Sequence, residues 1–187
     1  MIAGHFGLAA AVKARSPRIP LWTLMLATAW LDVVFVPLLA LKVETIDPVP
    51  GTDGGYGEAV IHADYTHSVV GAVVLSVLFG AVAGWRLGRR AGVILGAVVF
   101  SHWVLDLVVH RMDLPLLPGN AGDLPRLGFG LWRAPAVSVA VEVLLMAVGF
   151  WLYWRAAARV DRKRARTVGV VAVLSGVVTI VLDLAAV

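Results

Sequence analysis

Long, nearly uninterrupted apolar stretches dominate the chain, and short segments rich in charged residues, glycine and proline separate them. A helix needs about 20 predominantly apolar residues to cross a bilayer, because backbone groups find no water there. Five stretches meet this requirement, and each predicts a membrane-spanning helix: residues 21–41, 66–85, 91–110, 135–154 and 167–187.

The segments outside these stretches complete the predicted architecture. Residues 1–12 are apolar but too few to cross, and we expect a short interfacial or half-inserted helix there. Segment 42–64 predicts an external loop with little regular structure, and segment 111–134 a shaped, largely non-helical cap over the outer ends of spans three and four. Glycines repeat every four residues at 80, 84, 88, 92 and 96, which predicts close helix packing. The expected fold is all-α and polytopic, with one membrane-embedded domain over residues 1–187.

Composition and charge support a membrane protein. Of the 187 residues, 60% are hydrophobic and 15% charged, against about 25% charged in soluble domains. Twelve of the 16 lysines and arginines precede the first span or lie between spans two and three or four and five. The positive-inside rule therefore predicts a cytoplasmic N-terminus and an external C-terminus. Topology accounts for the basic charge, so no nucleic-acid partner is expected. The chain has no cysteine, which excludes disulfides and thiolate metal ligands.

Ionisable side chains inside a span are costly, so each one is a functional candidate. Counting 1.5 Å per residue places them all in the outer half of the bilayer: Asp32, His67, His102, Asp106, His110 and Glu142. His102 and Asp106 are four residues apart and therefore share one helix face. This spacing favours two ligands for one ion, although a hydrogen-bonded His–Asp pair that braces the bundle would use the same residues.

Imidazole and carboxylate ligands without thiolate suit Zn²⁺, Mn²⁺ or Fe²⁺. Asp106 could bridge two ions, because His110 is too far along the helix to share one ion with His102. His5 needs a separate argument. If residues 1–12 form a helix that dips into the bilayer, His5 could meet Asp32 near the midplane, and otherwise it is a histidine at the membrane surface.

With these residues placed, the chain resembles the YdjM-like family of bacterial inner-membrane proteins, which are described as metal-dependent hydrolases. The resemblance rests mainly on Thr-His-Ser at 66–68 and Ser-His-x-x-x-Asp at 101–106, with Gly-His-Phe at 4–6 and residues 110–115 in support. The order of His and Asp residues is also distantly similar to zinc-dependent phospholipase C. That similarity implies the metal ligands His5, Asp32, His67, His102, Asp106 and His110. No histidine follows His110, a departure that favours two ions over three.

The leading functional prediction is a metal-dependent hydrolase in the bacterial inner membrane, acting on a lipid or lipid-linked phosphoester from the non-cytoplasmic side. One or two divalent ions, with zinc as the first choice, would activate water, and Glu142 or Asp113 would act as general base. Two alternatives stay open. Buried His and Asp residues also build divalent-metal or proton transporters, and a non-catalytic scaffold with a structural metal would use the same residue types.

Overall fold

Helices make up most of the part of the chain that the computed structural model describes, namely residues 2–52 and 57–163 together with positions 165, 170, 174, 177, 178 and 181. Two short strands form an antiparallel hairpin, and two single-turn 3₁₀ helices lie in a loop. The elements in chain order are α1 (Ile2–Arg15), α2 (Leu21–Thr28), α3 (Trp30–Ala40), β1 (Thr45–Pro48), β2 (Ala59–His62), α4 (Val69–Leu87), α5 (Arg89–Val109), η1 (Pro118–Asn120), η2 (Leu131–Arg133) and α6 (Pro135–Ala158).

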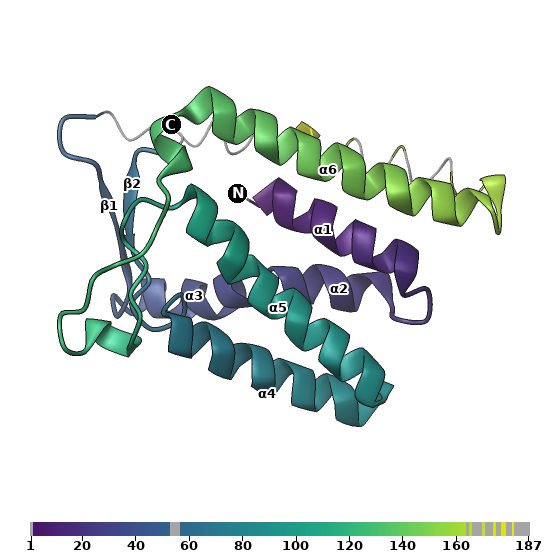
Figure 1. The fold of residues 1–187 in the computed structure, drawn as a ribbon, viewed down its shortest axis with the longest axis horizontal. Coiled ribbons are helices and arrows are strands. Elements are labelled where there is room, and N and C mark those ends of the chain that lie inside the picture. Colours follow the sequence, from purple (N-terminus) through teal and green to yellow (C-terminus); the bar gives the residue numbers. More distant parts are fainter. Residues whose placement is uncertain are drawn as a thin grey trace.

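Helix α5 occupies the centre of the bundle. It packs along α4 on one side and against α2 on another, while α1 lies between α2 and α6 (Figure 1). The core is aliphatic where these helices meet, and Leu24, Leu31, Leu95 and Val99 are fully buried. Helix α5 contacts α1, α2, α3 and α4, so its side chains can meet residues from each of these helices.

Within the part of the chain that the structure describes, three helices, α4, α5 and α6, are long and apolar enough to cross a membrane. Their outward surfaces agree with this, since the apolar windows of α4 and α6 are each only 17% buried inside the protein. Counting the bent pair α2 and α3 as one span raises the number to four. The prediction of five spans is therefore not supported, and its fifth segment, 167–187, lies largely outside the described residues.

The first predicted span is broken. Helices α2 and α3 meet at Ala29 and are bent by 51° relative to each other. The continuous apolar pattern of residues 21–41 gives no sign of this break, and Pro37 lies eight residues beyond it, inside α3. Non-helical backbone at membrane depth is tolerated where it is buried in protein and its polar groups find partners, and the partners at this break lie in the candidate site.

Glycines allow two helix pairs to approach closely. A Cβ atom at Gly80 of α4 would lie 2.9 Å from the backbone oxygen of Gly92 in α5, which confirms the close packing predicted from the glycine spacing. Helices α1 and α6 meet in the same way at Gly7 and Gly149, where a Cβ on Gly149 would overlap the backbone of Gly7. Helix α1, predicted as interfacial or half-inserted, consequently packs within the bundle.

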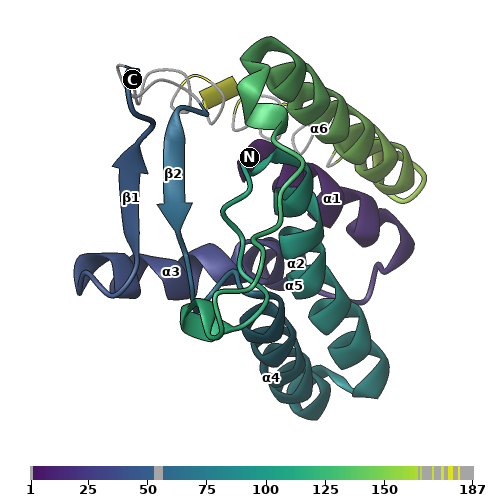
Figure 2. The same ribbon diagram turned by 60° about the vertical axis from the view of Figure 1, so that its left-hand side comes forward.

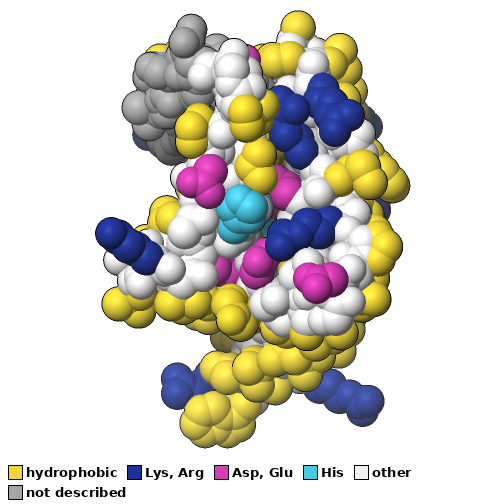
Figure 3. Space-filling view, turned by 90° about the vertical axis from the view of Figure 1, so that its left-hand side faces the viewer, with side chains coloured by type: hydrophobic (Ala, Val, Ile, Leu, Met, Phe, Trp, Pro, Cys, Tyr) yellow, Lys and Arg dark blue, Asp and Glu magenta, His cyan; other side chains and the backbone are white. Residues whose placement is uncertain are grey.

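The segment predicted as an irregular loop contains the hairpin of β1 and β2, which pairs Thr45 with His62 and Pro48 with Ala59 (Figure 2). The second loop, 111–134, covers the C-terminal end of α5 and contacts α6 through η2, in the place predicted for a cap, and it also covers the N-terminal end of α4. Its Pro115 and Leu116 carbonyls accept hydrogen bonds from the first amides of α4, and Gly130 donates to the carbonyl of His110. At this end of the molecule, acidic, basic and histidine side chains gather on a face bordered by hydrophobic ones (Figure 3).

Candidate metal centre

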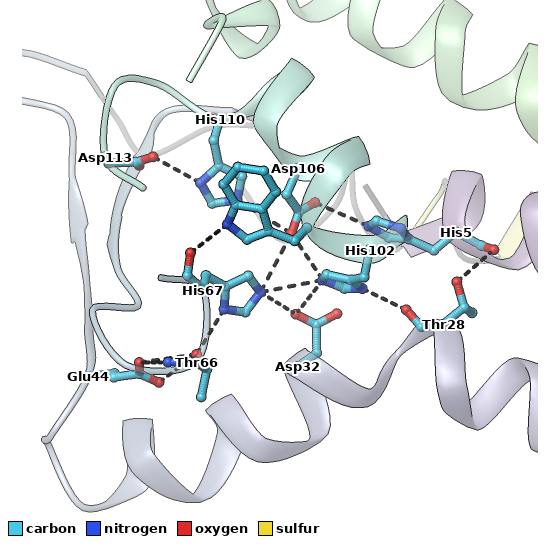
Figure 4. A network of polar contacts seen from close by, with 11 residues as sticks. His5, Thr28, Asp32, Glu44, Thr66, His67, His102, Asp106, His110 and Asp113 are labelled. Atoms are coloured by element: carbon cyan, nitrogen blue, oxygen red, sulfur yellow. Dashed lines mark hydrogen bonds and ion pairs between the residues drawn. The ribbon is translucent and has the colours of Figure 1, made fainter. Parts of the chain in front are cut away.

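The six residues predicted as metal ligands lie together around the carboxylate of Asp106 (Figure 4). They come from four regions that are distant in sequence: His5 from α1, Asp32 from α3, His67 from the residues before α4, and His102, Asp106 and His110 from α5 and its C-terminal cap. His5 therefore joins the cluster, which the sequence alone left open. All but Asp32 are at least 96% buried.

Local structure explains why these side chains converge. His102 and Asp106 lie one turn apart on the inner face of α5, and His102 Nε2 is 3.0 Å from Asp106 Oδ2. Ser68 caps α4 by accepting a hydrogen bond from the amide of Gly71, which ends the preceding loop with His67 directed at α5. Trp103 fixes this position further, since its indole N–H donates to the carbonyl of His67 over 2.8 Å.

The helix break also serves the cluster. The carbonyl oxygen of Thr28, at the end of α2, accepts a hydrogen bond from His102 Nδ1 over 2.6 Å. The hydroxyl of the same threonine donates to the backbone oxygen of His5 over 3.1 Å. Asp32 lies in the first turn after the break, and the bend directs its carboxylate at His67 and His102. The irregular backbone thus connects three of the candidate ligands.

Four candidate ligand atoms lie close to one another: Asp32 Oδ1, His67 Nε2, His102 Nε2 and Asp106 Oδ2. The two histidine nitrogens are 3.4 Å apart, and their distances to the two carboxylate oxygens range from 3.0 to 3.6 Å. A tetrahedral ion with bonds of about 2.0–2.1 Å requires ligand atoms about 3.3–3.4 Å apart. The five distances are close to this spacing. Two overlapping groups of three residues could each hold a metal ion, namely Asp32, His67 and His102, and His5, His102 and Asp106.

Hydrogen-bond partners determine the tautomer of each of three histidines. His102 Nδ1 faces a carbonyl oxygen and His110 Nδ1 faces Asp113 Oδ1 at 3.0 Å, and both acceptors require a proton on Nδ1. Each imidazole, when neutral, then presents the lone pair of Nε2 to the Asp106 carboxylate. A lone pair and a carboxylate oxygen repel each other unless a proton or a metal cation lies between them, and a divalent ion could accept the lone pairs of several histidines together with the carboxylate.

Glu44 determines the third tautomer, and sequence reasoning missed this residue. Its buried carboxylate accepts hydrogen bonds from the amides of Tyr65 and Thr66, each over 2.8 Å, and from the Thr66 hydroxyl at 3.0 and 3.1 Å. Because the hydroxyl proton goes to Glu44, Thr66 Oγ1 accepts from His67 Nδ1, 2.8 Å away. The Glu44–Thr66 pair thus directs the lone pair of His67 Nε2 into the cluster, as outer partners of metal-binding histidines do.

We expect Thr66→Val to weaken metal binding by about 10–100-fold, because the variant keeps the side-chain shape but removes the acceptor of His67 Nδ1–H. Competition against a coloured chelator measures the dissociation constant. The matched control is Thr66→Ser, which retains the hydroxyl and should bind within a few-fold of wild type. Equal affinities for the Val and Ser variants would show that the hydroxyl does not position His67.

The Asp106 carboxylate divides its contacts between two sides. Its Oδ2 faces His67, His102 and, at 3.9 Å, His110, while its Oδ1 lies 3.1 Å from His5 Nε2. The His5 ring stacks on the His102 ring with centroids 4.0 Å apart. Since its two oxygens face different histidines, Asp106 could bridge between one metal position beside His67 and His102 and a second beside His5.

The two residues predicted as general bases lie at the border of the cluster. Asp113 contacts it through His110, and its other oxygen accepts from the amide of Ile61 over 3.1 Å. Glu142 lies on α6, where its Oε1 accepts from the amide of Gly4, next to His5. A carboxylate at this helix N-terminus is electrostatically favourable. Their roles as general bases stay predictions.

The cluster is accessible on one side. The Asp32 side chain is 39% exposed, whereas those of His5, His67, His102, His110 and Asp106 are between 1% and 6% exposed. Val33 and Val36, which follow Asp32 on α3, are also exposed. A ligand approaching the cluster would therefore meet Asp32 first, on a helix whose outer surface is apolar.

The chain was compared with family models, with curated proteins and with solved structures. None of the three comparisons gives a match.

Proposed function

We propose that the chain is a membrane-embedded, metal-dependent hydrolase of lipid or lipid-linked phosphoesters. The observation that carries the proposal is the close approach of two imidazole nitrogens and two carboxylate oxygens, from His67, His102, Asp32 and Asp106, buried except at Asp32. The resemblance to the YdjM-like family points to the same activity. Zinc is the proposed metal, because it favours tetrahedral nitrogen and oxygen ligands, with manganese and iron as the next choices.

A divalent ion held there would supply Lewis acidity, which lowers the pKa of water toward about 7 and stabilises charge developing on phosphoryl oxygens. The chain's own residues position the reactants. His102, His67 and Asp106 form the buried wall, and Asp32 lies at the accessible side. In the reaction, a water oxygen bonds to phosphorus as the ester P–O bond breaks, and the departing oxygen takes a proton. Asp113 orients His110, whose Nε2 lies 3.9 Å from Asp106 Oδ2 and could take a proton from the attacking water and pass it to the departing oxygen.

We propose that the cluster faces the non-cytoplasmic side of a bacterial inner membrane. The turns after α1 and α4 and the end of α6 carry most of the basic residues and lie at one end of the bundle, opposite the hairpin and the loops (Figure 1). A lipid could then reach Asp32 laterally along the apolar surface of α3. If segment 167–187 crosses the membrane as the sequence predicts, a periplasmic-only reporter should be active when fused after Val187, and activity confined to a cytoplasmic reporter would overturn this topology.

A panel assay tests the hydrolase proposal. Purified protein in mixed detergent–lipid micelles, loaded with zinc or manganese, should release phosphate or a phosphorylated headgroup from at least one member of a panel of phosphatidic acid, larger phospholipids and polyprenyl phosphates. A chelator should abolish this release and added metal should restore it. Fully metal-loaded protein that hydrolyses no member of the panel would contradict the proposal.

One feature favours a second candidate, a non-catalytic scaffold with a structural metal. If Asp32, His67, His102 and Asp106 all bound one ion, the protein would fill its coordination shell, as in structural zinc sites, whereas catalytic sites keep a position for water. The exposure of Asp32 favours the hydrolase over the scaffold, because a substrate could displace this ligand. In the scaffold case, metal would raise the melting temperature strongly and Asp32→Ala would lower it, without any hydrolysis to lose.

A further inference from the structure

A cavity lies at the opposite end of the bundle from the metal cluster. It has a volume of about 440 Å³ and is formed between the α1–α2 turn and the α4–α5 turn (Figure 1). Three arginines line it, Arg15, Arg18 and Arg90, and the remaining walls include the aliphatic side chains of Ile19, Leu87 and Ile94. The cavity therefore combines a cluster of positive charge with an apolar wall.

The arginines are available for a ligand. None of the residues lining the cavity is acidic, and across residues 2–52 and 57–163 none of the three guanidinium groups forms an ion pair. Guanidinium groups bind phosphate oxygens in a bidentate manner. Three like charges around one cavity repel each other, and a bound anion would relieve that repulsion.

The turn that carries two of these arginines is braced. Lys13 Nζ donates hydrogen bonds to the backbone oxygens of Pro17 and Ile19, over 2.8 and 2.7 Å, and thereby closes the α1–α2 turn. Ile19 is 95% buried and anchors the turn on the bundle. The backbone around Arg18 is thus held in place before any ligand binds, which reduces the entropic cost of binding.

We propose that this cavity binds the phosphate of an anionic phospholipid, with the acyl chains against its aliphatic wall. The position supports a lipid over a soluble anion, because α4 and α5 are long enough to cross a bilayer and their connecting turn would then lie at headgroup depth. Basic pockets between helices at this depth recognise anionic headgroups. The site is separate from the metal cluster and does not depend on hydrolysis there.

Lipid binding to the full chain in a neutral detergent tests the site, with phosphatidylglycerol, phosphatidylcholine and inorganic phosphate as probes and native mass spectrometry as the readout. We expect phosphatidylglycerol to bind at least about tenfold more tightly than phosphatidylcholine, and Arg18→Gln/Arg90→Gln to weaken phosphatidylglycerol binding by about tenfold or more. The control, Arg86→Gln/Arg162→Gln, removes the same charge near the same end but outside the cavity, and should change binding less than about threefold.

Each contrary result overturns the site in a distinct way. Equal losses of phosphatidylglycerol binding in the two double variants would show that general surface charge, and not the cavity, attracts the lipid. Equal binding of the two lipids would show that the cavity does not select a headgroup. Binding of inorganic phosphate as tight as that of phosphatidylglycerol would identify a soluble-anion site. Both double variants should keep the metal content of wild type, so a failure here leaves the hydrolase proposal unaffected.

Discussion

Replacing Asp106 with asparagine should weaken metal binding by more than about a hundredfold and remove hydrolysis, while the variant still inserts and folds. Asp106 lies at the centre of the cluster. Its Oδ2 faces His67 and His102, and its Oδ1 contacts His5. Asparagine retains the size and one carbonyl oxygen but loses the negative charge that attracts a divalent ion. Since removing only an outer partner of a ligand costs about 10–100-fold in affinity, loss of a charged central ligand should cost more.

The same change made elsewhere provides the control. Asp47 lies 3.4 Å from His62 on the hairpin, where both side chains are exposed, so Asp47→Asn removes a carboxylate from a histidine outside the cluster. Metal affinity and hydrolysis should stay at wild-type values in that variant. Tight metal binding by Asp106→Asn, at wild-type stoichiometry, would refute the assignment of Asp106 as a ligand.

Gly149→Ala should destabilise the fold and disturb the cluster from a distance. The new Cβ would overlap the backbone of Gly7, so α1 and α6 must separate. Overpacking of this kind costs about 1–3 kcal/mol, which corresponds to a melting temperature lower by about 3–10 °C for a protein of this size. His5 lies half a turn from Gly7 on α1, and its contact with Asp106 should weaken as the helix moves.

Gly84→Ala is the matched control for the added methyl group. Gly84 also lies at a glycine-rich helix contact, but its added Cβ would be 3.7 Å from Gly92 Cα, an ordinary packing distance. Its melting temperature should stay within about 2 °C of wild type. Thermal unfolding followed by circular dichroism compares the two variants, and equal melting temperatures would contradict the tight α1–α6 contact.

The long helices could be predicted because their apolar runs are continuous and nearly free of charge. The break at Ala29 could not, because no glycine or proline marks that position and its stabilisation comes from a distant residue, His102. The hairpin was missed for a different reason. Its strands have four residues each, and β1 contains Asp47 and Pro48, residue types that favour turns over strands.

The meeting of most candidate ligand residues could be predicted because ionisable groups are costly within apolar stretches and their depths coincide. Their outer partners carry no such signal. Thr28 contributes a backbone carbonyl to His102, and every residue type offers that group. Glu44 is one of several acidic residues in a polar loop, and only the folded arrangement shows that it bonds Thr66.

The metal content of wild-type protein, purified without added metal and measured by elemental analysis, tests the central claim most directly. The cluster geometry predicts one or two divalent transition-metal ions per chain, retained through size-exclusion chromatography, with zinc as the expected metal. Their loss in a His102→Ala variant that still folds would place them at the cluster. Wild-type protein that carries no such metal, and takes up none when incubated with zinc, would contradict the account.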